Sequence, residues 1–82
     1  MTCDCCGKKK KLLDMFWSVG EGREKSSLCS ECWNVVERLE SDVAGGEKEL
    51  YGLHLIQLKK RAQNPSETFL TWQRAHFPEN FV

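Results

Sequence analysis

Long apolar stretches, a signal segment and net charge are all missing from this chain of 82 residues, and each absence excludes a class of protein. The longest apolar stretch, Leu53–Leu58, falls far short of the roughly 20 residues that a membrane-spanning helix needs. No basic region followed by an apolar run comes after Met1, so we expect no secretory signal. Twelve basic residues balance twelve acidic ones, which argues against a strongly basic nucleic-acid binder. We therefore expect a cytoplasmic protein with no membrane partner.

Cysteine, in contrast, is plentiful, with five residues in the first 32 positions. An odd number fits a disulfide framework poorly, and C-x-x-C pairs in a reducing cytosol more often bind metal or act in redox chemistry. Two such pairs occur, Cys3 with Cys6 and Cys29 with Cys32. Four thiolates can hold one tetrahedral Zn²⁺ at Zn–S distances of about 2.3 Å, and chains this small often need a metal for stability. We predict one structural Zn²⁺ with these four cysteines as its ligands.

The residues around each pair support this prediction but leave other uses of the thiols open. Gly7 allows the backbone to fold back close to the metal, and backbone N–H groups in a C-x-x-C-G turn can hydrogen-bond the sulfurs. The second pair stands at the expected start of a helix, where the helix dipole favours a negative sulfur. An iron–sulfur cluster also takes four thiolates, and either pair alone could be a redox pair. Cys5 is expected to be a surplus thiol, exposed beside the site.

Between the two pairs the sequence predicts a β-hairpin. Apolar and polar residues alternate from residue 11 to residue 19, which predicts a strand with one mostly apolar face. Glycines at both ends of Gly20–Gly22 mark a turn, and residues 24–28 are expected to return as a short edge strand. Trp33, just inside the following helix, is expected to pack on this hairpin.

Three helices are expected after the hairpin. The first covers residues 30–42, with Ser30 as its N-cap. The second covers residues 47–63, because acidic residues begin it and basic residues end it; a strand in its middle is the alternative. The third runs to about residue 76 after an N-cap at Asn64.

The order of a C-x-x-C-G knuckle, a hairpin and a helix-borne C-x-x-C pair resembles the treble-clef group of zinc fingers. The residues that carry the resemblance are Cys3, Cys6, Gly7, Cys29 and Cys32. It covers about residues 1–43 and implies a zinc site without implying an activity, because this fold has many uses. We expect a small α+β, zinc-stabilised domain. A treble-clef-like module over residues 1–43 is followed by a helical extension over residues 44–82 that packs on it.

Catalysis is not expected in this chain. Four cysteine ligands leave no open coordination position for a substrate, so the metal is expected to be structural and no small-molecule substrate is expected. No nucleophile elbow or phosphate loop is present, so we expect no enzyme. His54 and His76 are expected to be packed or solvent-facing rather than metal ligands, because four cysteines suffice.

Three tryptophans and four phenylalanines are many binding anchors for so small a chain. They favour a non-catalytic protein-interaction or regulatory module that binds a protein partner or a second copy of itself. The expected partner surface lies on the apolar middle helix and consists of Leu50, Tyr51, Leu55 and Leu58. The alternative is a nucleic-acid-binding zinc finger whose basic clusters contact phosphates. Those clusters are Lys8, Lys9, Lys10 and Lys11, with Arg23, Lys25, Lys59, Lys60 and Arg61.

Overall fold

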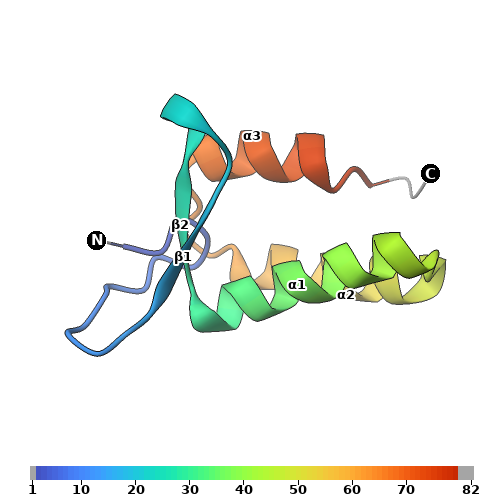
Figure 1. Cartoon of the computed structure of the whole chain (residues 1–82), viewed down its shortest axis with the longest axis horizontal. Coiled ribbons are helices and arrows are strands. Elements are labelled where there is room, and N and C mark those ends of the chain that lie inside the picture. Colours follow the sequence, from blue (N-terminus) through green and yellow to red (C-terminus); the bar gives the residue numbers. More distant parts are fainter. Residues whose placement is uncertain (1, 80–82) are drawn as a thin grey trace.

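The computed structural model describes residues 2–79, so the outermost residues of both expected modules lie outside the described part. The chain forms a small α+β structure, as predicted, with a two-stranded hairpin and three α-helices. Figure 1 shows helices α1 and α2 running together, α3 alongside them in a separate layer, and the hairpin standing across one end of the helices. In the described part, no helix combines the length and apolar character needed to cross a bilayer.

The elements follow one another in the order hairpin, then helices. They are β1 (Phe16–Val19), a short 3₁₀ turn η1 (Gly22–Glu24), β2 (Ser26–Cys29), α1 (Ser30–Gly45), α2 (Lys48–Arg61) and α3 (Glu67–His76).

The predicted hairpin is confirmed, but its first strand is shorter than the alternation suggested. Strands β1 and β2 pair antiparallel from Phe16 opposite Cys29 to Val19 opposite Ser26. Pairing cannot extend further back along β1, because the residue after Cys29 already belongs to α1. The preceding segment, residues 11–15, therefore has no partner strand and forms a turn instead, so the strand prediction was wrong there.

The side chain of Asp14 stabilises that turn, which exposes apolar residues at its tip. The Lys11 N–H donates to Oδ2 of Asp14 at 2.9 Å, and the Asp14 N–H donates to the Lys11 carbonyl at 3.1 Å. Such local side-chain hydrogen bonds compete with strand formation. Leu12 and Leu13, at the tip of the turn, are 94% and 92% exposed. Leu13 and Met15, which belong to the predicted apolar face, are both exposed, so the alternation did not mark a buried face at this end of the segment.

Helix α1 begins and ends close to the predicted positions. Cys29 is the N-cap, one residue before the predicted cap, so Ser30 is already helical. The helix continues three residues past the predicted end at Asp42 and stops at Gly46, whose φ of 68° is left-handed. The Trp33 ring stacks on Trp17 of β1, with centroids 6.1 Å apart, which confirms that it packs on the hairpin.

Helix α2 settles the choice between helix and strand in favour of the predicted helix. Tyr51, Leu55 and Leu58 are 2%, 5% and 0% exposed because this face packs into the chain's own core. The expected partner surface is therefore corrected: these three residues are core, and only Leu50 of the predicted four is exposed, at 44%. The error arose because apolar residues surround much of this helix, so the sequence did not show which face would turn inward.

Helix α3 begins two residues later than predicted. Ser66, not Asn64, is its N-cap, and the Ser66 Oγ accepts a hydrogen bond from the Phe69 N–H at 3.1 Å. The Asn64 N–H is directed instead to the Cys5 carbonyl at 3.4 Å. Phe69 is completely buried and anchors α3 in the same core that contains the cysteines.

Candidate metal centre

The four predicted cysteines converge on one point in space. The sulfur atoms of Cys3, Cys6, Cys29 and Cys32 all lie within 4.8 Å of one another. Sulfurs at about 2.3 Å from one tetrahedral ion would be separated by about 3.8 Å. The Sγ atoms of Cys6 and Cys29 are 3.7 Å apart, which fits that spacing. The chain therefore contains a four-cysteine group that could hold one metal ion, with the ligand set that the sequence indicated.

The first pair is presented by a short knuckle of backbone hydrogen bonds. The Gly7 N–H donates to the Cys3 carbonyl at 3.0 Å, and the Cys3 N–H donates to the Lys8 carbonyl at 2.8 Å. Gly7 has a φ of 83°, a conformation that a side chain would strain. This confirms why the sequence places glycine directly after Cys6: the turn that brings both sulfurs to one side requires it.

Asp4 fixes the knuckle to the hairpin, a role that the sequence did not reveal. Its N–H donates to the Ser27 carbonyl at 2.7 Å, and its Oδ2 accepts from the Ser27 N–H at 2.6 Å. The knuckle is thereby fixed beside the strand that leads into Cys29. An aspartate between two cysteines carries no spacing signal of its own, so only the fold could identify this contact.

The second pair stands where strand β2 becomes helix α1. Cys29 is the last residue of the strand and the N-cap of the helix, and Cys32 lies in the first helical turn. Unpaired backbone N–H groups at a helix start favour negative charge there. Cys3, Cys29 and Cys32 are at most 1% exposed, so water has little access to the sulfurs.

Four thiolates so close together need a cation to remain charged. Burial opposes ionisation of Cys3, but backbone hydrogen bonds from Cys29, Cys6 and Cys5 lower its pKa to about 7. Burial raises the pKa of Cys6 to about 12, and the nearby negative charge of Cys32 adds to this effect. Burial likewise raises the pKa of Cys29. Without a cation the group cannot ionise fully at neutral pH, and a bound metal supplies the compensating charge.

Arg61, at the C-terminal end of α2, is the second residue that the sequence failed to connect with this site. Its Nε donates to the Cys32 sulfur at 3.3 Å, and its terminal NH₂ group donates to Glu31 at 2.9 Å. The hydrogen bond to Cys32 raises the pKa of Arg61, so the guanidinium stays charged. Arg61 follows Lys59 and Lys60, so its local sequence indicates only a basic cluster and gives no sign of contact with a residue 29 positions away.

Cys5 is buried, not exposed as predicted. It is 0% exposed because the segment between α2 and α3 lies over the knuckle. The Ser66 N–H donates to the Asp4 carbonyl at 2.9 Å, next to the contact between Asn64 and Cys5. The side chain of Cys5 also hydrogen-bonds that of Cys32, and this contact is the largest cause of the raised pKa of Cys32. Cys5 therefore borders the four-cysteine group and belongs to the core.

The histidines pair with carboxylates elsewhere. His54 Nδ1 lies 2.6 Å from Oδ2 of Asp42, a contact that links α2 to α1. His76 Nε2 lies 2.7 Å from Oε1 of Glu40 and its ring stacks on Trp72. Neither histidine belongs to the four-cysteine group.

The predicted basic residues do not form one free surface. The side chains at positions 8–11 are exposed, as are Arg23 and Lys25. Lys59 makes an ion pair with Glu79, and Arg61 is engaged at the cysteine group. Lys8 also lies 4.0 Å from Oδ2 of Asp14, so three of the nine predicted phosphate-binding residues already have acidic partners within the described part of the chain.

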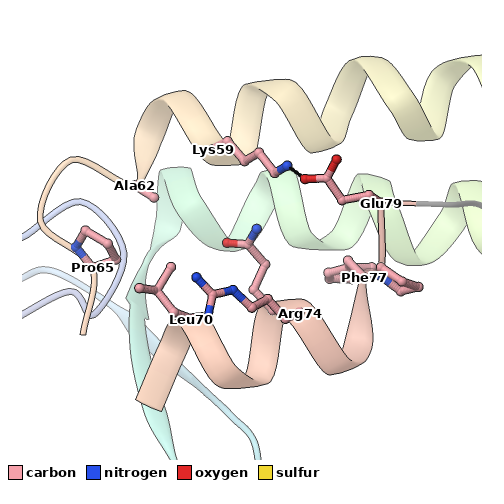
Figure 2. Close-up of a pocket in the computed structure, with 9 residues that line it drawn as sticks. Lys59, Ala62, Pro65, Leu70, Arg74, Phe77 and Glu79 are labelled. Atoms are coloured by element: carbon pink, nitrogen blue, oxygen red, sulfur yellow. Dashed lines mark ion pairs between the residues drawn. The ribbon is translucent and has the colours of Figure 1, made fainter. Parts of the chain in front are cut away.

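A pocket of about 450 Å³ lies between the end of α2 and helix α3, and none of its lining residues is a cysteine. Figure 2 shows Lys59 reaching from α2 to Glu79, while Leu70 and Arg74 project from α3. Much of the lining is apolar, including Ala62. Because it contains no cysteine, this pocket is not the metal site.

Comparison of the chain with models of protein families, with characterised proteins and with solved structures found no match. The protein is therefore classified from its own fold and from the arrangement of its cysteines. It is a small α+β protein in which an N-terminal knuckle and the junction between a hairpin and a helix together form a four-cysteine group that could bind one metal ion.

Proposed function

We propose that this chain is a zinc-stabilised, non-catalytic module of the treble-clef type that acts by binding another protein molecule. The convergence of Cys3, Cys6, Cys29 and Cys32 is the observation that carries the proposal. A mononuclear tetrahedral site with four thiolates is the usual setting of structural Zn²⁺. The order of knuckle, hairpin and helix-borne pair supports the treble-clef assignment.

The non-catalytic part of the proposal follows from the coordination and burial of the site. Four thiolates complete a tetrahedral zinc site, so no position remains for water or substrate. Three of the four sulfurs belong to buried residues, and one of these, Cys32, also accepts a hydrogen bond from Arg61. A metal so enclosed supplies folding free energy rather than chemistry.

The interaction part is supported by apolar surface that the chain leaves uncovered. Leu12 and Leu13 are more than 90% exposed on an ordered turn, and Met15 beside them is 69% exposed. Leu53 and Ile56 are more than half exposed on α2. Apolar side chains gathered on the surface of so small a protein are typical of binding sites.

The nucleic-acid alternative has less support. Its strongest feature is the exposed lysine run at positions 8–11, which could contact phosphates. Its second cluster, at the end of α2, is weakened because Lys59 and Arg61 are paired with Glu79 and Glu31. We therefore keep nucleic-acid binding as the second candidate.

Native mass spectrometry of the purified chain tests the zinc proposal. We expect one zinc ion per chain, lost on treatment with a chelator, and loss of zinc on substitution of Cys6→Ala. Cys5→Ala is the matched control, because Cys5 neighbours the site without belonging to the four-cysteine group, and this variant should retain one zinc. An iron–sulfur mass, or full zinc occupancy in the Cys6→Ala protein, would contradict the proposal.

A further inference from the structure

We infer that the outward face of α2 is a self-association surface that pairs antiparallel with the same face of a second copy of this chain. The surface, here called the α2 stripe, consists of Glu49, Leu53, Ile56 and Lys60. This inference rests on the proposed interaction function and names its partner.

The α2 stripe lies on one side of the helix because its residues are spaced by four, three and four positions. All four side chains are exposed, and Leu53 and Ile56 are 53% and 54% exposed. Leu50, at 44%, flanks them. The opposite side of α2 is buried in the core, so the stripe faces away from the rest of the molecule. Apolar side chains at the centre and charges at both ends form a helix face without a partner in the described part of the chain.

The order of residues in the stripe is self-complementary. A two-fold axis at its midpoint places Leu53 opposite Ile56 of the second copy and Glu49 opposite Lys60 of the second copy. The acidic residue at the start of one helix then meets the basic residue near the end of the other, at both ends of the pair. A parallel arrangement would place Glu49 against Glu49 and Lys60 against Lys60, and like charges repel. Charge complementarity therefore selects the second copy in antiparallel orientation.

Gly52 gives independent support for close approach of another helix. Glycine in the interior of a helix lowers its stability relative to alanine. No atom of the chain lies within 4 Å of where a Cβ at this position would be, so packing within the molecule does not require glycine here. Gly52 precedes Ile56 by one helical turn and so borders the stripe. The missing side chain leaves room for a neighbouring backbone at the point where two stripes would cross.

The expected association is weak and reversible. Helix α2 has 14 residues, so the contact would extend over about 21 Å. A single pair of helices this short buries less surface than the interfaces of stable dimers. We expect a monomer–dimer equilibrium that shifts with protein concentration.

Sedimentation equilibrium of the zinc-loaded full chain, from micromolar to millimolar concentration, tests whether the chain dimerises through Leu53 and Ile56. We expect reversible dimerisation, weakened at least about tenfold in Leu53→Ser/Ile56→Ser because both partners lose their central contacts. Both side chains are half exposed, so this variant should still fold, which far-UV circular dichroism would verify. A monomer at every concentration, or a dimer that this variant leaves unchanged, would overturn the inference.

Charge swaps test the antiparallel register. At low salt, Glu49→Lys and Lys60→Glu should each weaken dimerisation about threefold or more, because each variant creates two repulsive contacts. The double variant Glu49→Lys/Lys60→Glu restores opposite charges in antiparallel pairing and should recover the affinity. Glu37→Lys makes the same charge change at an exposed position of α1 and should have little effect. Failure of the double variant to recover would refute this register.

Zinc content measured on the same samples separates this inference from the proposed zinc function. A zinc-loaded protein that stays monomeric overturns self-association and leaves the metal proposal intact. A dimer without zinc would support the stripe and contradict the metal proposal.

Discussion

Arg61 shows at the scale of single residues how the two halves of the chain are coupled. Its guanidinium joins the end of α2 to the first turn of α1 through Cys32 and Glu31. A zinc site with four thiolates carries a net charge of about −2. A cation that donates to one of the sulfurs offsets part of this charge and holds the ligand in place.

Replacing Arg61 should therefore weaken metal binding without abolishing it. We expect Arg61→Gln to lower zinc affinity about tenfold, as the loss of an outer hydrogen bond to a ligand commonly does. Competition with a chromophoric chelator at neutral pH measures this. Arg38→Gln, a matched change at an exposed position of α1, should leave the affinity unchanged. An unaltered affinity in Arg61→Gln would show that the contact has no effect on the metal.

At the scale of elements, the starts of α1 and α3 each depend on a residue that also makes contacts beyond its own helix. Cys29 serves both as the end of β2 and as the N-cap of α1, so the four-cysteine group and the helix start share one residue. Ser66 caps α3 with its side chain while its backbone N–H donates to the knuckle at Asp4. The cap of α3 therefore also fixes the segment that covers Cys5.

Removing the side-chain cap of α3 should destabilise the protein. We expect Ser66→Ala to lower the free energy of unfolding by about 1 kcal/mol, because the Phe69 N–H loses its acceptor. For a domain of this size the midpoint of thermal unfolding should fall by roughly 4–8 °C. Ser41→Ala, at an exposed position of α1, is the control and should change the midpoint much less. Equal effects in both variants would argue against the cap.

At the scale of the whole molecule, the cysteine group and the hydrophobic core are one unit. Cys3, Cys5, Cys29 and Cys32 belong to the same buried cluster as Leu28, Leu39 and Phe69. Loss of the metal should therefore disturb packing across the hairpin and all three helices. Metal removal is expected to lower the stability of the entire chain rather than of the knuckle alone.

The pH dependence of stability should have opposite signs with and without metal. In the metal-free protein the pKa of Cys6 is raised to about 12, and those of Cys29 and Cys32 are also raised. Each of these thiols contributes stability that is fully present below about pH 8.5, the pKa of a cysteine in the unfolded chain. This stability is lost as the pH rises above that value and through the pKa of the thiol in the folded chain. The lowered pKa of Cys3, about 7, acts in the other direction between pH 7 and that unfolded value.

Because three raised pKa values oppose one lowered value, metal-free protein should be less stable at pH 10 than at pH 8. Zinc-loaded protein should instead lose stability on acidification, because protons compete with the metal for the sulfurs. Thermal unfolding followed by circular dichroism, with zinc and with chelator, measures both trends. The same direction of pH dependence in both samples would contradict this account.

Local sequence determined much of this protein. The spacing of the cysteines identified the four sulfurs that converge, because a C-x-x-C turn brings its own two sulfurs together. The alternating pattern and the glycines identified the hairpin, and the helical spacing and charge order identified the helices. These features depend on residues a few positions apart, so the sequence alone displays them.

Only the tertiary structure decided the rest. Asp4 and Arg61 support the four-cysteine group through partners 23 and 29 positions away, and Cys5 is buried by a segment that arrives after α2. The packing of α2 on α1 also decided that Tyr51 is core while Leu53 is exposed. Burial and long-range hydrogen bonds depend on which distant segments meet, and neither spacing nor composition records that.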